Sequence, residues 1–133
     1  MRRGLLLAAL LASPAGALEP MDGAAFRAFS EGWTLHFSDE SGAYFGTEQY
    51  FEDGRTIWAP SGGGCHHGIW AEDAGRICFL YDVGLSCWKL FSEGEDSILA
   101  ESVETGPGGG PPTRLRLMRK DRSAAPCDEG PGV

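Results

Sequence analysis

The chain has 133 residues, 42% of them hydrophobic and 11% aromatic, and its formal net charge at pH 7 is −8. This length predicts a single domain. The excess of acidic residues repels phosphate backbones and anionic lipids, which argues against nucleic-acid binding and against attachment to an anionic membrane surface.

The first 17 residues have the organisation of a secretory signal peptide. Arg2 and Arg3 precede the apolar stretch 4–12, and small residues at 13–17 provide a cleavage site after Ala17. The apolar stretch is about half of the roughly 20 residues that a membrane-spanning helix needs. We therefore expect a periplasmic or secreted protein without a membrane span. Loss of the two arginines would change its net charge from −8 to −10, because all acidic residues follow the cleavage point.

Four cysteines predict two disulfides, because an even number of cysteines in a small exported chain is typical of a disulfide framework. Three pairings are possible. Cys78 and Cys87 flank a hairpin-turn signal at 82–84, which would place them opposite each other on adjacent strands, so we favour this pair. Cys65 and Cys127 then pair by elimination. A zinc site is the alternative, but none of the spacings is C-x-x-C.

A short helix is expected over residues 23–30, where Phe26 and Phe29 fall at helical spacing. Asp22 is a suitable N-cap, and Gly32 marks the end of the helix. From Trp33 onward, short runs of aromatic and β-branched residues are separated by turn residues.

These runs predict a series of short strands. They cover residues 33–37, 43–51, 56–59, 68–72, 76–82, 86–92, 98–103 and 114–118. Short turns without helical crossovers favour antiparallel pairing, and about eight such strands protect their edges by closing into a barrel or packing as a sandwich. We therefore expect a mainly β domain over 18–120, a small antiparallel barrel or sandwich with one short N-terminal helix, and choose the barrel.

Two stretches rich in glycine and proline, 60–64 and 106–112, are predicted to be flexible loops, and residues 121–133 a flexible tail. The strict alternation of Arg114, Leu115, Arg116 and Leu117 places the arginines in solvent and the leucines in the core. This pattern is that of a half-buried strand and not of a basic patch.

Histidines suggest a metal site only weakly. His66 and His67 are adjacent, so in an extended segment they point to opposite faces and do not chelate one ion unless the loop turns there. A three-histidine site would need His36 from a different predicted strand, and H-x-H spacing is absent. We expect no bound metal.

Motifs for hydrolysis are also missing, since the chain contains neither G-x-S-x-G nor H-E-x-x-H. The carboxylates Glu48, Glu52 and Asp53 could form an acid and base pair, but acidic residues near a hairpin tip are typically solvated turn residues. The glycine run 62–64 lacks the lysine and the helix start of a phosphate loop. We expect no cofactor.

Aromatic residues offer the best candidates for ligand contact. In a barrel of about eight strands they either fill the core or line a cavity for one small molecule. We expect most of them to fill the core. Trp58 and Trp70, together with His66 and His67 beside the glycine loop, are the candidate ligand-binding residues.

Several short segments resemble a known group of proteins. They are Gly32-Trp33-Thr34-Leu35, Gly46-Thr47-Glu48-Gln49-Tyr50, Ile57-Trp58, Cys65 with Gly68-Ile69-Trp70, Ile77-Cys78-Phe79 and Cys87-Trp88. Over residues 21–91 the chain is similar to small exported alphaproteobacterial proteins of unknown function. These proteins contain the motifs G-x-W, x-C and C-W in this order along the chain. The resemblance implies that Cys78 and Cys87 pair, and it implies no activity. Cys127 lies outside it.

These observations favour a binding module over an enzyme: an exported, disulfide-stapled β-domain that binds a small-molecule ligand or a protein partner. An enzyme inhibitor fits this class, with residues 18–22 or 60–67 as the inhibitory segment. The alternatives are a metal-dependent or hydrolytic enzyme that uses His36, His66 and His67, and a structural envelope component.

Overall fold

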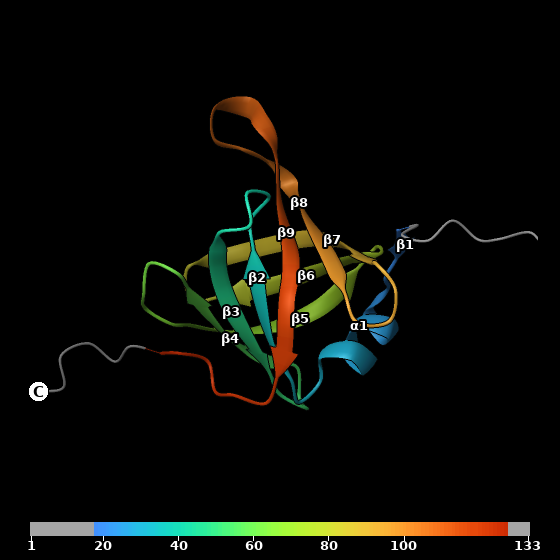
Figure 1. Ribbon diagram of the computed structural model, residues 1–133, viewed down its shortest axis with the longest axis vertical. Helices are drawn as coiled ribbons and strands as arrows, with labels where there is room; N and C mark the ends of the chain where they lie inside the picture. The colour runs from blue at the N-terminus through green and yellow to red at the C-terminus, as the bar shows by residue number, and fades with distance from the viewer. Residues whose placement is uncertain (1–17, 128–133) are drawn as a thin grey trace, which may run out of the picture.

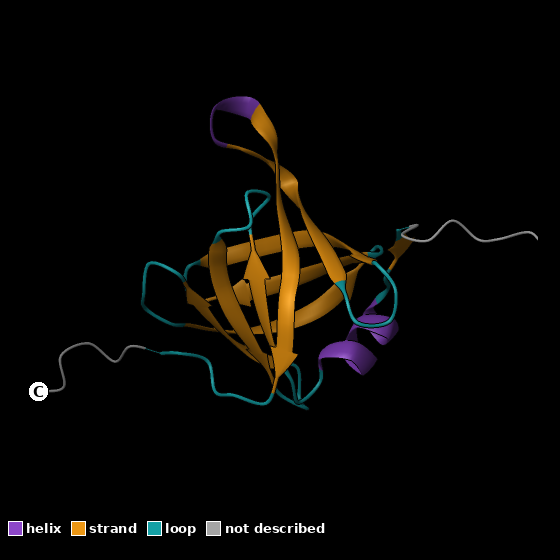
Figure 2. Ribbon diagram, viewed as in Figure 1, coloured by secondary structure: helices purple, strands orange, loops and turns teal. Residues whose placement is uncertain are grey.

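Nine strands and one short α-helix make up residues 18–127, the part of the chain that this computed structural model describes. Strands β2 to β9 pair antiparallel one after another, and β9 also pairs with β2, so that eight strands close into a barrel (Figures 1 and 2). The short β1 adds to the edge of β7. The predicted small antiparallel barrel with one N-terminal helix is confirmed.

The elements follow the expected order along the chain. Their bounds are β1 (Glu19–Pro20), α1 (Gly23–Ser30), β2 (Thr34–Ser38), β3 (Tyr44–Tyr50), β4 (Arg55–Pro60), β5 (His66–Asp73), β6 (Arg76–Tyr81), β7 (Gly84–Ser92), β8 (Ile98–Gly106), the 3-10 turn η1 (Pro107–Gly109) and β9 (Gly110–Asp121). Successive side chains on each strand point alternately into and out of the barrel. On β6, Ile77 and Phe79 are buried inside, whereas Leu80 is 52% exposed on the outer face.

Helix α1 closes one end of the barrel with Phe26. The Phe26 ring is 1% exposed and packs edge-on against Tyr50, Trp70 and Phe79, with ring centroids 5.2, 5.1 and 6.5 Å away. Edge-to-face contacts of this kind stabilise aromatic pairs beyond the area that they bury. The helix therefore completes the core at this end, where the strands alone would leave the aromatic side chains open to water.

The start of α1 depends on Asp22, whose carboxylate accepts a hydrogen bond from the backbone N–H of Ala25 (2.8 Å). Replacing Asp22 by Ala leaves this N–H without a partner from the cap, and we expect the free energy of unfolding to fall by about 1 kcal/mol. Urea unfolding measures the change. Asp22→Asn keeps a capping oxygen and serves as the control, so an equal loss in both variants would contradict the capping role.

The β8–β9 hairpin extends beyond the barrel (Figure 1) and differs from the expected loop over 106–112. Pairing continues outward to Gly106 opposite Gly110, and only η1 separates the two strands. Gly108 and Gly109 have φ angles of 72° and 77°, a conformation that favours glycine, so the chain reverses within three residues. Beyond the barrel the two strands pair only with each other, and an edge of this kind tolerates prolines that lack an N–H.

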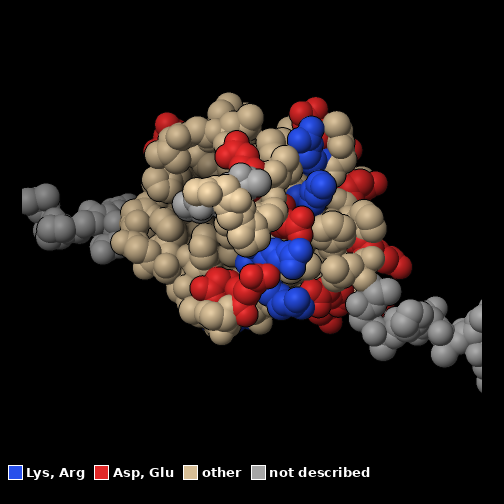
Figure 3. Space-filling model, turned by 90° about the horizontal axis from the view of Figure 1, so that it is seen from above, with Lys and Arg blue, Asp and Glu red and all other residues tan. Residues whose placement is uncertain are grey.

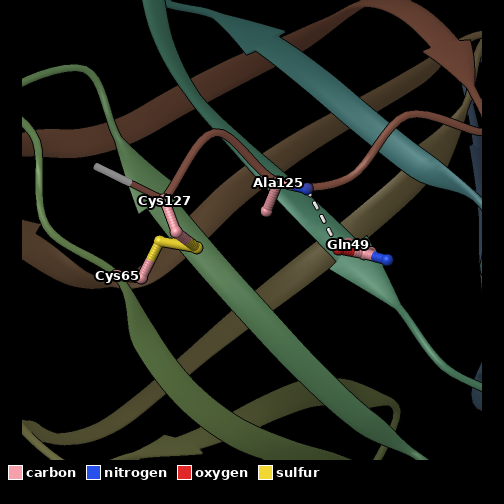
Figure 4. The surroundings of a disulfide bond; sticks show 4 residues. All are labelled: Gln49, Cys65, Ala125 and Cys127. Carbon is pink, nitrogen blue, oxygen red and sulfur yellow. Dashed lines mark hydrogen bonds between the residues drawn. A yellow bond between two sulfur atoms is a disulfide. The ribbon is translucent and has the colours of Figure 1, made fainter. Parts of the chain in front are cut away.

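The two disulfides join Cys78 to Cys87 and Cys65 to Cys127, the pairs that the sequence favoured. Cys78 and Cys87 are direct partners on β6 and β7. After β9 the chain runs along the outside of the barrel to Cys127. Figure 4 shows Cys127 bonded to Cys65, the residue just before β5. Within this segment the N–H of Ala125 donates to the side-chain oxygen of Gln49 (3.0 Å).

The segment 122–127 covers part of the outer face of β2. Thr34 and His36 point away from the barrel interior, yet they are only 1% and 6% exposed. The Thr34 hydroxyl donates to the backbone oxygen of Ser123 in this segment. The expected domain boundary after residue 120 lies one residue before the end of β9 at Asp121. Residues 1–17, with the expected signal peptide, and residues 128–133 of the expected flexible tail lie outside the described residues.

Arginines on β9 are paired with carboxylates. Arg114 contacts Glu101 (3.0 Å), and Arg116 contacts Glu93 (2.5 Å). Figure 3 shows the Lys and Arg side chains of this face lying among Asp and Glu side chains. Leu115 between them is 5% exposed, as the alternation predicts. Opposite charges at these distances largely cancel each other, so β9 presents no unpaired basic stripe.

Among residues 18–127, α1 is much too short to cross a bilayer, and no other helix reaches the required length and hydropathy.

Candidate functional site

A cavity of about 250 Å³ occupies the barrel interior. Side chains from α1 and from most of the barrel strands line it: Phe26, Phe37, Phe45, Glu48, Tyr50, Trp58, Phe79, Tyr81, Ser86, Trp88, Leu90, Ile98, Ala100 and Leu115. Its lining is almost entirely aromatic and aliphatic. This volume exceeds the roughly 150 Å³ of a cavity that holds benzene, and it is slightly below the roughly 300 Å³ at the lower limit of ordinary ligand pockets. The cavity therefore suits a molecule with about one ring.

Glu48 is the one acidic residue in this lining among the described residues. It lies on β3 between Gly46 and Tyr50, which share its inward face, and it is 3% exposed. The hydroxyl of Tyr81 on β6 donates to both carboxyl oxygens, at 2.7 and 2.9 Å. Two strands on different parts of the barrel thus hold one hydrogen-bonded pair at the cavity wall.

Burial controls the protonation of this pair. Removal of the Glu48 carboxyl from water raises its pKa to about 8, and the hydrogen bond from Tyr81 opposes this shift only in part. The pKa values of Tyr81 and of nearby Tyr50 are also raised, mainly by burial and further by the proximity of Glu48. At neutral pH both phenols are therefore protonated, and Glu48 is mainly neutral.

Some aromatic residues fill the core and others line the cavity, so both of the roles considered from the sequence occur. Phe26 and Tyr50 fill the core beside α1, whereas Phe45, Trp58 and Trp88 are half-buried and face the cavity. Trp58 crosses the neighbouring strand so closely that a side chain at Gly46 would overlap its ring. The absence of a side chain at Gly46 thus gives the Trp58 indole its position.

The four candidate ligand-binding residues do not converge. Trp58 on β4 lines the cavity and pairs directly with His66 on β5. Trp70 lies four residues after His66 on the same strand, which places it about 13 Å from His66 at the usual rise per residue. Trp70 is 7% exposed and packs against Phe26 in the core, with the Arg27 guanidinium 4.6 Å from its ring centroid. Trp70 therefore belongs to the closed end of the barrel.

His66 and His67 lie on opposite faces of β5, as their adjacency predicts. His66 is half-buried, and its Nδ1 lies 3.1 Å from a carboxylate oxygen of Asp82. His67 is exposed and pairs in register with Ile57. Neither histidine is among the residues that line the cavity.

His36 belongs to a separate polar network on the outer face. Its Nδ1 lies 2.8 Å from the Thr47 hydroxyl, and its Nε2 lies 3.1 Å from Asp121. The order of hydroxyl, imidazole and carboxylate resembles a nucleophile with its base, but Thr47 is 0% exposed and its hydroxyl also contacts that of Tyr44 (2.6 Å). No substrate reaches a hydroxyl buried in this way, and the network is structural.

Strands β3 and β4 lie between His36 and the other two histidines in the sheet. Within residues 18–127, no three side chains of the histidine, cysteine, aspartate or glutamate type are grouped as a metal ion would require.

Comparisons with protein-family models, curated proteins and solved structures find no match to this chain.

Glu48 and Tyr81 were not predicted as site residues from the sequence. Glu48 was expected to be a solvated turn residue like Glu52 and Asp53, but it lies two residues inside the end of β3 and points inward. The alternation of side chains along β3 contained the information needed to predict this burial. Glu48 and Tyr50 lie on the same face of the strand, so burial of that face buries both residues.

Proposed function

We propose that this chain is an exported binding module that takes one small, mainly apolar molecule into its barrel. The observation that carries the proposal is the cavity of about 250 Å³, apolar except for a few polar groups, of which the Glu48 carboxyl is buried and accepts from Tyr81. Ligand sites in proteins typically combine apolar walls with a few polar groups that orient the ligand. A barrel of eight strands is of the size that holds one small ligand.

The disulfides support the exported location and the stability of such a module. Two disulfides fit an oxidising compartment, in agreement with the expected periplasmic or secreted location. A small domain that keeps an internal cavity gives up packing contacts, because atoms facing an empty space lose their dispersion partners. Covalent links between β6 and β7 and between β5 and the C-terminal segment compensate for this loss.

Filling the cavity tests the proposal. Ala100 on β8 faces the cavity, so Ala100→Leu places three additional carbon atoms there. We expect saturable binding of 2-phenylethanol or 2-phenylethylamine to the native chain, followed by the fluorescence of Trp58 and Trp88, and a loss of affinity of at least about tenfold in the variant.

Ala71→Leu is the matched control, because Ala71 is exposed on the outer face of β5. Its affinity for both molecules should equal that of the native chain, and circular dichroism shows whether each variant is folded. The proposal fails if neither these two molecules nor phenylacetate binds the native chain, or if a folded Ala100→Leu binds the first two as tightly as the native chain does.

A further inference from the structure

The carboxyl group of Glu48 has no counter-charge in the cavity. Among the described residues, no lysine, arginine or histidine lines this space. Its oxygens accept hydrogen bonds from the Tyr81 hydroxyl, and the buried hydroxyl of Thr56 on β4 lies near them, so the groups that the protein offers to this carboxyl are neutral. An isolated charge is very costly to bury, so without a cation beside it this carboxyl group keeps its proton. The interior thus holds an acid that a bound cation would convert to its charged form, and none of the described lining residues supplies that cation.

The aromatic walls favour the same kind of partner. The rings of Phe79 and Tyr81 are stacked with an interplanar angle of 3° and centroids 5.9 Å apart, and Phe45 lies beside Trp58 with centroids 5.9 Å apart. All four residues line the cavity. The faces of aromatic rings carry negative partial charge and attract cations, tryptophan most strongly. A carboxyl group and four aromatic rings in one cavity make its interior attractive to positive charge.

We propose that the ligand of this barrel is a small apolar amine, whose ammonium group pairs with Glu48 and whose hydrocarbon part lies among Trp58, Tyr81 and the neighbouring rings. This inference rests on the proposed function. It goes further because it specifies the charge of the ligand and the residue that recognises it.

Other ligand classes fit the cavity less well. A carboxylate ligand would place a second acid beside Glu48 with no cation near either group, so one of them would have to bind a proton. A neutral alcohol would make a hydrogen bond to Glu48 but would leave the electrostatic attraction of the ring faces unused. An ammonium group donates up to three hydrogen bonds and carries the positive charge that stabilises the carboxylate form of Glu48.

Amine binding moves one proton. In the empty cavity at neutral pH the Glu48 carboxyl mainly keeps its proton, and pairing with an ammonium ion favours the carboxylate, so the proton leaves to solvent while the amine stays charged. The other titratable groups that face Glu48 are the phenols of Tyr81 and Tyr50, and both keep their protons because their pKa values are raised. The released proton therefore comes from Glu48.

Three isosteres of one ring and one short chain test the inference: 2-phenylethylamine, 2-phenylethanol and phenylacetate. Near neutral pH, calorimetric titration of the native chain should give an affinity for the amine at least about tenfold higher than for the alcohol, and the weakest affinity for the carboxylate. Titrations in buffers of different ionisation enthalpy should show proton release with the amine and none with the alcohol.

Glu48→Gln separates charge from shape. Glutamine keeps the size of the side chain and an oxygen that accepts from Tyr81, so the variant should fold and keep the cavity. Its affinity for 2-phenylethylamine should fall at least about tenfold, while its affinity for 2-phenylethanol changes by less than about threefold. Tyr81→Phe keeps the carboxyl group and should retain the preference for the amine.

The possible results distinguish the two proposals. Equal affinities for amine and alcohol in the native chain, or an amine preference that survives Glu48→Gln, would overturn the amine proposal and leave the binding module in place. Tightest binding of phenylacetate would overturn it as well. Absence of binding by all three molecules would instead overturn the proposed function.

Discussion

The native chain should lose stability relative to Glu48→Gln as the pH rises from about 4.5 to about 8, the interval between the ordinary pKa of Glu48 and its pKa in the folded barrel. Within this interval the unfolded chain has released the Glu48 proton and the folded chain still holds it. Unfolding therefore releases a proton, and raising the pH favours the unfolded state by about 1.4 kcal/mol per pH unit.

Over the whole interval the free energy of unfolding of the native chain should fall by about 5 kcal/mol relative to that of Glu48→Gln, with little further change at higher pH. Urea unfolding at a series of pH values measures it. Asp121 acts in the opposite direction, because its hydrogen bonds, first that from Ser123, lower its pKa and stabilise the folded state until acid protonates it. Both proteins share Asp121, so their difference isolates Glu48.

Glu52→Gln provides the control for this experiment. Glu52 lies in the exposed turn after β3, so replacing it removes one carboxyl group without changing the barrel interior. Its unfolding free energy should follow that of the native chain at each pH. Curves for the native chain and Glu48→Gln that stay parallel from pH 4.5 to 8 would show that Glu48 is ionised in the folded protein, in contradiction of its raised pKa.

Removing the Cys65–Cys127 disulfide is expected to have the second large effect. The two cysteines are 62 positions apart, and on the chain-entropy model a link across a loop of this length contributes about 4 kcal/mol to stability. Small domains have a net stability of only about 5–15 kcal/mol. The double variant Cys65→Ser, Cys127→Ser should therefore unfold at a much lower urea concentration than the native chain.

The second disulfide supplies the matched comparison. Cys78 and Cys87 are 9 positions apart, and the same model gives about 3 kcal/mol for this short loop. Serine replacement of both should thus destabilise less than loss of the long link. Loss of the long link also frees the segment that covers Thr34, so hydrogen exchange on β2 should accelerate in that variant alone. A greater loss from the short link would contradict this ranking.

Local signals in the sequence were sufficient to predict the barrel. Asp82 to Gly84 marked the β6–β7 turn, which placed Cys78 opposite Cys87, and the alternation around Leu115 identified its inward face. Each of these signals involves residues that are close in the chain. Turn chemistry and strand period act over a few residues, and such local rules are visible without the tertiary structure.

The site depends on contacts between distant residues and was not predicted. Glu48 and Tyr81 are 33 positions apart and meet only because the barrel closes. A glutamate near a turn is usually solvated, and only the inward direction of β3 places this one in an apolar interior. The choice of Trp70 and the two histidines rested on their closeness in sequence to the glycine loop, which strand alternation and the rise along β5 override.

Closure of the barrel also determines the order in which the molecule assembles. The β2–β9 seam pairs Thr34 with Asp121, nearly the two ends of the domain, whereas β6 and β7 are joined by a tight turn. Pairing between distant segments has a high contact order and is slow, because the entropy of closing the intervening chain is lost first. The β6–β7 hairpin, with its Cys78–Cys87 disulfide, can therefore form early in folding. The cavity in the barrel exists only once β9 has paired with β2.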